Sequence, residues 1–326
     1  MIIIENVPQM MLHSHNGIDG GLAVEIKNLL KEMQYEVIDG VLNAADFGVP
    51  QIRERVFIMA SRIGKPSLPS PSHADPLNAD MLQSNFLPWV TAGEAISDLP
   101  SPPLGPADKL GGGPVSHYLK RTPSTFARKM RSARYFPYNH VIREYKASVI
   151  SLVEHIQSGE TWDDASARMR KKYEMEIKAQ KQIGEDVEAC RERLIAVGVI
   201  NPSFYKKYYW SAYTRLERER PALTITANAN FLGSGRFTHP QQDRGITIRE
   251  AARIQSFEDD FTFLTSMGTQ NLTTNIGVGL DMIGEAVPPL LAEAIAWSAH
   301  TLLIKSESSG NRRPCVDVSQ ELANQT

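Results

Sequence analysis

The sequence has very little cysteine. Among its 326 residues only Cys190 and Cys315 occur, and neither stands in a Cys/His spacing typical of zinc ligands. Two distant cysteines exclude a disulfide framework and a structural zinc site of the usual kind, and they fit a reducing compartment. We therefore predict a cytoplasmic protein.

The sequence also lacks a long apolar run and a strong charge of either sign. No run reaches the ~18 apolar residues of a membrane span. The opening Met1–Ile4 has no basic flank and is followed at once by Glu5, so it predicts a buried strand and not a signal peptide. The net charge is −2, so any basic surface that binds nucleic acid must be confined to one part of the chain.

Residues 1–64 alternate between strand-like and helix-like patterns. Apolar runs predict strands at 2–4, 35–42 and 55–61, and an amphipathic pattern predicts a helix at 21–33. Strands separated by a helix and short loops favour part of a doubly wound α/β sheet. The composition changes at Gly64, where we place the end of this region.

Residues 65–218 differ in composition from what precedes them. The segment up to 115 is rich in proline and glycine, with a short helix predicted near 92–99. From 120 to 146 there are eight Lys or Arg against Glu144 alone, with aromatic residues between them, and 163–198 is a charged helical stretch ending at Gly198. This composition predicts a separate, irregular region.

Residues 219–304 again have the composition of a globular domain. A strand is predicted to begin near 220–226, a helix capped by Thr247 at 247–256, and a helix with proline in its first turn at 288–299. The polar tail, 305–326, is predicted to be disordered.

Two short segments near the amino end carry polar groups to predicted strand ends. Glu5-Asn6-Val7 follows the first strand, where α/β sheets hold their ligands. In isolation it is as easily a carboxylate that caps a turn. The segment 43–58 brings Arg53 and Arg55 to alternate positions, so both side chains can point to one face of a strand.

Two further segments lie in 219–304. The first comprises 220–226, 235–240 and 244–257; in it Glu250 is interpreted as a helix-capping residue, while Arg249 and Arg253, expected to be exposed, are left open. The spacing of residues in the second segment, 283–291, predicts no more than a glycine turn followed by a helix that begins with proline.

Taken in order, these segments resemble the sixth, eighth, ninth and tenth conserved blocks of the DNA cytosine-5 methyltransferases. The resemblance covers most of 1–300, with 65–215 matching only as the family's variable target-recognition region. It implies a Rossmann-like methyltransferase sheet without its amino-terminal strands, and we expect only the carboxy-terminal portion of such an enzyme. Ile52 and Glu285 depart from residues usual in these blocks. The family's glycine-rich cofactor loop and Pro-Cys-Gln nucleophile block have no counterpart.

The resemblance assigns roles to individual residues. Glu5 matches the carboxylic acid held against N3 and the 4-amino group of a flipped cytosine, and Arg55 matches the arginine that binds O2. Arg53 is expected to position the base or the phosphate of its nucleotide. The cofactor is S-adenosylmethionine, with a contribution from Glu285, Ala286 and Val287.

The resemblance also implies duplex DNA as partner, in a restriction–modification system of a bacterial or phage-like setting. Phosphate contacts require cations, and the segment 120–146 offers them. A solvated amphipathic helix explains that segment equally well. The residues assigned to DNA are Gln51, Arg128, Lys129, Arg131, Arg134, Thr224 and Thr226.

Neither cysteine matches the nucleophile block. Cys315 is followed by Val316 and not by glutamine, and Cys190 lies in a charged helical stretch. Three interpretations stay open: an enzyme that needs a complementary polypeptide bearing the cofactor loop and cysteine, a DNA-binding remnant without activity, and a sequence whose true start lies upstream. Each predicts no methyl transfer by the chain alone.

Overall fold

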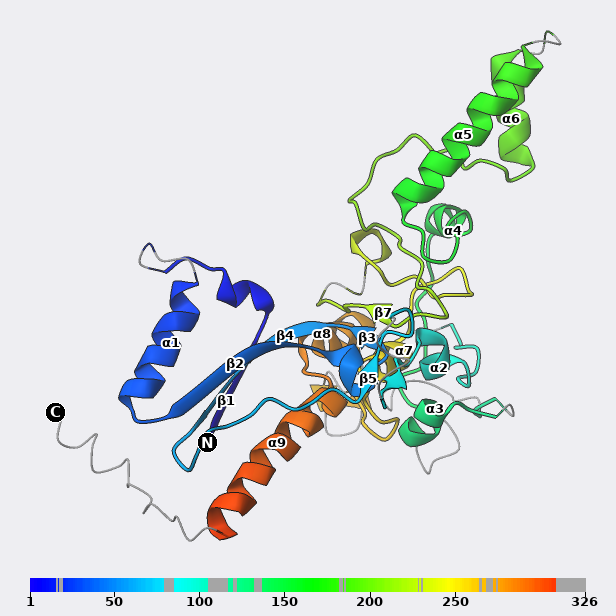
Figure 1. The fold of residues 1–326 in the computed structure, drawn as a ribbon. Coiled ribbons are helices and arrows are strands. Elements are labelled where there is room, and N and C mark those ends of the chain that lie inside the picture. The colour runs from blue at the N-terminus through cyan, green and yellow to red at the C-terminus, as the bar shows by residue number, and fades with distance from the viewer. Residues whose placement is uncertain are drawn as a thin grey trace. The chain divides into compact units, whose positions relative to one another are not determined.

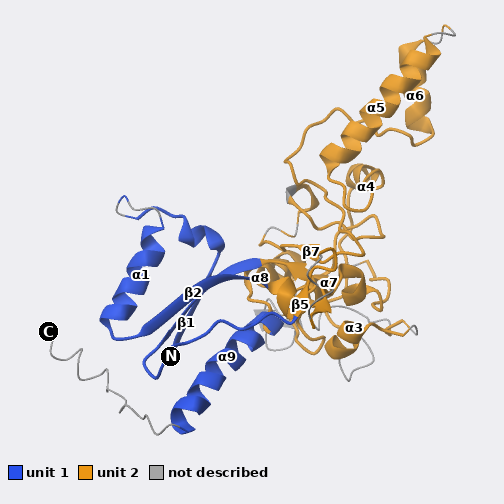
Figure 2. Ribbon diagram, in the orientation of Figure 1, with its two compact units in different colours: residues 1–43, 54–72, 290–326 blue, residues 44–53, 73–289 orange. Residues whose placement is uncertain are grey.

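A computed structural model describes residues 1–15, 17, 20–78, 85–104, 117–119, 122–131, 137–181, 184, 186–227, 229, 231–263, 266–267, 272–273 and 275–308. The chain forms two compact units (Figure 2). Unit 1 comprises residues 1–43, 54–72 and 290–326, and unit 2 comprises 44–53 and 73–289. These units do not follow the boundaries at 64 and 218 expected from composition, because 219–289 clusters with 73–218. The functional division at those boundaries stays a prediction.

Unit 1 is built on a three-stranded sheet of order β1-β4-β2, with both pairs antiparallel. The strands are β1 (Ile2–Asn6), β2 (Glu36–Asn43) and β4 (Glu54–Ser61). Helix α1 (Gly21–Glu32) and the short helix η1 (Pro8–Met11) bury apolar side chains against one face of this sheet (Figure 1). The α/β alternation and the three strand positions were predicted correctly.

Strand β1 lies at the edge of the described sheet, which differs from the fully buried strand predicted for Met1–Ile4. Its one neighbour is β4 among the residues described. Ile2 and Ile4 pack toward the α1 core, while Ile3 is 42% exposed. The difference arises because alternate residues of a strand face opposite sides, and only one side of β1 is covered by α1 and η1.

Helix α9 (Pro289–Ser308) completes unit 1. Its Ser298 hydroxyl lies 3.3 Å from that of Ser67, and a Cβ on Gly64 would lie 3.3 Å from Leu302. Residues 305–308 continue this helix, contrary to the disorder predicted from 305 onward. Residues 309–326, including Cys315, lie outside the described part of the chain.

The stretch 276–308 is long and apolar enough by length and composition to cross a membrane, although it holds no run of ~18 consecutive apolar residues. The core helix of a soluble protein can have the same length and composition. The stretch is interrupted at Ala286, whose extended backbone ends α8 (Ile276–Glu285) before α9 begins.

Unit 2 has little regular strand. Its described strands are two residues long, and β3 pairs with β7 in parallel although the two lie far apart in sequence. Its elements are η2 (Ala44–Phe47), β3 (Gln51–Ile52), β5 (His73–Ala74), β6 (Leu87–Pro88), α2 (Ala92–Ile96), α3 (Thr125–Met130), α4 (Ala147–Val153), α5 (Trp162–Gln180), α6 (Val187–Ala196), β7 (Ala222–Leu223), η4 (Leu232–Ser234), α7 (Ile248–Ile254), β8 (Ser266–Met267), β9 (Leu272–Thr273) and α8.

The charged stretch predicted as one helical segment forms two helices, α5 and α6, which pack side by side (Figure 1). Thr161 and Asp164 form a capping box at the start of α5, and Asp186 caps α6. Gly198 has φ 71°, the left-handed conformation predicted for the end of this stretch. Cys190 is fully buried between these helices.

Candidate functional site

Glu5 and Arg55 form an ion pair at the end of β1. The antiparallel register places Glu5 opposite Phe57, so Arg55, two residues from Phe57, lies diagonally across on the same face. Glu5 Oε1 is 3.0 Å from Arg55 Nε, with the side chains 27% and 13% exposed. Burial lowers the pKa of Arg55, and the Glu5 carboxylate opposes that shift. The pair presents an acceptor beside a donor, which suits a ligand edge that carries both.

Arg53 binds backbone carbonyl groups and not Glu5. It lies between β3 and β4, is 1% exposed, and donates to the carbonyl oxygens of Ile225 (2.8 Å), Gly284 (2.7 Å) and Ala286 (3.1 Å). The alternation had suggested that Arg53 and Arg55 share one face of a strand. Because Arg53 precedes the strand, that alternation does not apply to it. Its catalytic role stays a prediction, and its contacts are those of a residue that fixes the backbone around it.

Gln51 and Thr224, both assigned to DNA, hold β3 against β7. The Gln51 side chain is fully buried; its Oε1 accepts from the backbone N–H of Ile225 at 3.0 Å, and its Nε2 donates to Gln255. Thr224 donates its hydroxyl to Ile52 O at 2.8 Å. Thr226 is exposed and borders a cavity of about 640 Å³. Thr224 also lines this cavity, so both threonines can meet a ligand there, whereas Gln51 cannot.

The candidate cofactor residues lie where α8 ends. Glu285 is exposed, Ala286 and Val287 are half-buried, and Ala286 O accepts from both Arg53 and Gln255. None of the three is among the residues that line the cavities of about 40 Å³ and 640 Å³. By themselves these residues do not fit the whole of S-adenosylmethionine, because three consecutive residues at one helix end contact only part of so large a ligand.

The basic residues of α3 are only partly available. Arg128 and Lys129 are exposed in its last turn. Arg131 is paired with the buried Asp98 at 2.6 Å and lies over the Tyr118 ring. The remaining residue of the set, Arg134, lies outside the described residues, as do the aromatic residues next to it.

Arg249 and Arg253 are buried, which corrects the expectation that they are exposed. Both are 0% exposed, because every residue of α7 is buried. Arg253 pairs with Asp98 at 2.5 Å and Asp259 at 2.6 Å, and Arg249 donates to backbone carbonyls. Burial lowers the pKa of Arg249 to about 10. Local sequence gave no signal of this network, since Asp98 lies far from α7 in the chain.

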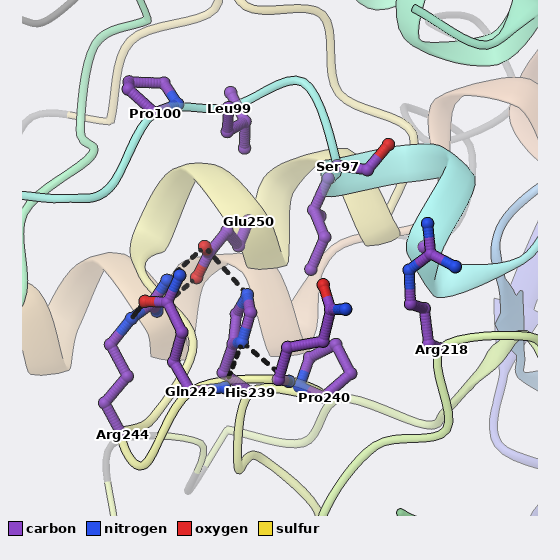
Figure 3. A pocket seen from close by; sticks show the side chains of 12 residues that line it. Ser97, Leu99, Pro100, Arg218, His239, Pro240, Gln242, Arg244 and Glu250 are labelled. Atoms are coloured by element: carbon purple, nitrogen blue, oxygen red, sulfur yellow. Dashed lines mark hydrogen bonds and ion pairs between the residues drawn. The ribbon is translucent and has the colours of Figure 1, made fainter. Parts of the chain in front are cut away.

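The capping role expected for Glu250 is confirmed. Thr247 and Glu250 form a capping box, and Arg244 donates two hydrogen bonds to the carboxylate (Figure 3). Burial alone would raise the pKa of Glu250, but Arg244 holds it well below the usual range. His239 Nδ1 accepts from two backbone N–H groups, which leaves the proton on Nε2, 3.6 Å from Glu250. The cavity beside them, about 40 Å³, has room for little more than water.

Comparison with known proteins identifies the family. The model of the C-5 cytosine-specific DNA methylases matches residues 1–300. A putative type II methyltransferase, M.OihORF3336P of Oceanobacillus iheyensis, is 29% identical over 91% of this chain and 67% of its own. Type II methyltransferase M1.HphI of Haemophilus parahaemolyticus is 27% identical over 90% of this chain and 55% of its own, and M.DdeI of Desulfomicrobium norvegicum is 28% identical over 90% and 61%. The chain thus spans about half to two thirds of the length of these bacterial relatives.

A solved structure supports the fold. A putative DNA modification methyltransferase encoded within an E. coli prophage superposes with a TM-score of 0.57 at 20% identity, over 92% of this chain and 69% of that one. At this identity the likeness shows the fold alone, an α/β methyltransferase fold.

The expectation of a match limited to the carboxy-terminal portion of the family's domain is wrong. The family model matches from the first residue to 300, including the segment treated as variable. The prediction of a cytosine-5 methyltransferase is confirmed: this chain belongs to the C-5 cytosine-specific DNA methylases.

Proposed function

We propose that this chain acts in methyl transfer to carbon 5 of a cytosine flipped out of duplex DNA, as part of a bacterial type II modification system in the cytoplasm. The names of its relatives support that setting. The observation that carries the proposal is the Glu5–Arg55 pair at the end of β1. Cytosine offers a donor, the 4-amino group, and two acceptors, N3 and O2, along one edge. A carboxyl group and a guanidinium side by side match that edge.

The chemistry assigned to Glu5 is charge stabilisation at N3. Carbon 5 of cytosine becomes a nucleophile when a thiolate adds to carbon 6, which moves electron density toward N3. A protonated Glu5 carboxyl donates its proton toward N3 as that density develops, and Arg55 donates to O2. In the absence of base the two side chains satisfy each other, so binding exchanges their mutual contact for contacts with the base.

The thiolate has to come from polypeptide other than the residues described. Cys190 is fully buried between α5 and α6, where no base can reach it, and Cys315 lies outside the described residues in a sequence unlike the nucleophile block. We propose that the cysteine and the main cofactor loop lie in polypeptide outside residues 1–300, on a complementary chain or in a longer form of this one. Strand β1, whose one neighbour in the described sheet is β4, is suited to pair with a further strand from it through the backbone groups of its other edge.

The methyl donor of this family is S-adenosylmethionine, which supplies the transferred methyl group when bound. In this chain Glu285, Ala286 and Val287 would form at most one wall of its site, since they are three consecutive residues at the end of α8. The fully buried Arg53 acts on this wall by fixing the Ala286 carbonyl, and so has a positioning role.

We assign DNA reading to the irregular region 65–218. Arg128 and Lys129, exposed on α3, contribute phosphate contacts. Arg131 contributes less, because Asp98 already neutralises its charge. The burial of Cys190 favours a second candidate function: a DNA-binding remnant that uses the same surface without catalysis.

Two assays test the proposal. The purified chain should bind duplex DNA with an affinity that falls with salt, and replacing both Arg128 and Lys129 by Gln should reduce the log–log salt slope by about 2. The chain alone should transfer no labelled methyl group. It should transfer the group once it is joined to the part of the Oceanobacillus relative that this chain does not match. Methyl transfer by the chain alone contradicts the assignment of the thiolate, and persistent inactivity of the joined protein favours the remnant.

A further inference from the structure

Unit 2 contains a cavity of about 640 Å³ to which the proposed function assigns no part of the reaction. Its lining includes Tyr209, Trp210, Arg236 and Phe237, with Thr226 at the border. None of these residues is Glu5 or Arg55, so the cavity is not assigned to the target cytosine. Its lining comes from residues 209–211, at the end of the irregular region, and from residues 224–237.

Two large aromatic side chains are exposed at this cavity. Trp210 is 57% and Tyr209 61% exposed, and their ring centroids are 5.7 Å apart. Large aromatic rings normally bury most of their surface, and adjacent exposed ones mark interaction sites. Their planar faces suit a flat ligand that stacks.

The positive charge of the lining favours a flat ligand that carries negative charge. Arg236 lies with its guanidinium carbon 4.8 Å from the centre of the Trp210 ring, and no Asp or Glu is among the described lining residues. A cation stacked beside an aromatic face favours a ligand that is planar and carries negative charge nearby. The Thr226 hydroxyl, which makes no hydrogen bond within the described residues, adds a donor and acceptor for a polar ring edge.

The backbone wall of the cavity depends on glycine. A Cβ on Gly233 would lie 3.3 Å from the Tyr213 hydroxyl, and a Cβ on Gly235 would lie 2.5 Å from the Phe237 ring. Larger residues at these positions would push the loop away from the aromatic side chains. The absence of side chains at Gly233 and Gly235 therefore lets this loop lie close to the aromatic residues, and the cavity stays open.

We propose that this cavity binds a second nucleobase of the DNA, unstacked from the duplex, with its ring on Trp210 and a flanking phosphate at Arg236. The inference rests on the proposed function, because it takes DNA to be the ligand. Stacking of a base on an aromatic side chain contributes about 1–3 kcal/mol, and it tolerates any base because every base has a π-face. The cavity thus favours DNA that is already distorted at one base, whatever its sequence.

The experiment compares two fluorescent duplexes. One carries a single unpaired (bulged) 2-aminopurine, and the other is fully paired. The full chain should bind the bulged duplex about 5- to 150-fold more tightly than the paired duplex, the range that such stacking gives, and 2-aminopurine emission should fall on binding. Trp210→Ala should remove both effects and leave the affinity for paired duplex unchanged, while Trp210→Phe should keep most of the preference. Trp297→Ala is the matched control, because Trp297 is similarly exposed (61%, against 57% for Trp210) but lies on α9 in unit 1.

The outcomes separate this inference from the proposed function. Binding of paired duplex without any preference for the bulge overturns the inference alone, and so does a preference that survives Trp210→Ala. Failure to bind either duplex overturns both. A preference that Trp297→Ala also removes overturns the assignment to this cavity.

Discussion

Glu5 and Arg55 are diagonal neighbours on one face of the β1–β4 pair, with Glu5 Oε1 3.0 Å from Arg55 Nε. Neither residue is close to the other in sequence. The register that sets Glu5 opposite Phe57 brings them together, and it does so within unit 1 alone. A carboxyl group and a guanidinium are therefore in place before any base binds.

Replacing Arg55 should weaken both capture of the flipped cytosine and its conversion. In the joined enzyme described above, Arg55→Ala removes the donor to O2 and leaves Glu5 without its partner. We expect a higher KM for DNA together with a lower kcat, measured by steady-state methyl transfer. Arg62→Ala is the control, since Arg62 is exposed in the same unit and lies over Tyr35. Equal effects of the two substitutions would contradict the role of Arg55.

Arg53 should matter chiefly for stability. Arg53→Ala leaves three buried carbonyl acceptors without their charged donor and opens a cavity, at a cost of about 3–5 kcal/mol in the free energy of unfolding. Arg128→Ala, at an exposed position, should cost less than about 0.5 kcal/mol. Urea denaturation of the three proteins measures both. A loss below about 1 kcal/mol for Arg53→Ala would mean that its contacts are not maintained in solution.

Gly284 should not tolerate a methyl group. A Cβ there would overlap the backbone of Thr226 and Ala227, which cannot move aside as a flexible side chain can. Overpacking costs about 1–3 kcal/mol, which exceeds the gain of about 1 kcal/mol from replacing glycine in a helix. Gly284→Ala should therefore lower the urea midpoint, whereas Val278→Ala, exposed on the same helix, should leave it nearly unchanged. A more stable Gly284→Ala protein would show that α8 does not pack this closely on the segment after β7.

Stability should fall as the pH is lowered from 7 to 5. Burial lowers the pKa of His239 from 6.5 to about 4, so the unfolded chain takes up this proton at a higher pH than the folded chain does. This difference removes about 2 kcal/mol between pH 7 and 5. His140, whose pKa is also lowered by burial, acts in the same direction. His239→Gln should lose less stability over that interval; an equal loss would show that His239 is not held neutral.

The elements of unit 1 could be predicted because their signals are local. Apolar runs marked β2 and β4, and in unit 2 an equally local signal, Thr247 with Glu250, marked the start of α7. The exposure of β1 and the burial of Arg249 and Arg253 could not be predicted, because both depend on what packs against the element. Asp98 and Asp259, which neutralise Arg253, lie outside α7. The Trp210–Arg236 cavity likewise joins side chains from separate loops.

The same distinction holds for the candidate site. Motif order placed Glu5 and Arg55 together, and the ion pair is consistent with that assignment. Motif order also grouped Gln51 with the DNA-binding residues, but its side chain is buried and bonded to Gln255 and to the backbone of Ile225. A motif preserves residues that hold the fold as well as residues that touch the ligand, and spacing does not distinguish the two.

The most direct test of the account is the turnover of Glu5→Gln in the joined enzyme. Glutamine keeps the size of the side chain and can still hydrogen-bond, but it cannot donate an acidic proton toward N3. Single-turnover methyl transfer should slow by about 10²–10⁴-fold, with the affinity for duplex DNA unchanged. A Glu5→Gln enzyme as fast as the parent would show that Glu5 only caps a strand, and would contradict the proposed mechanism.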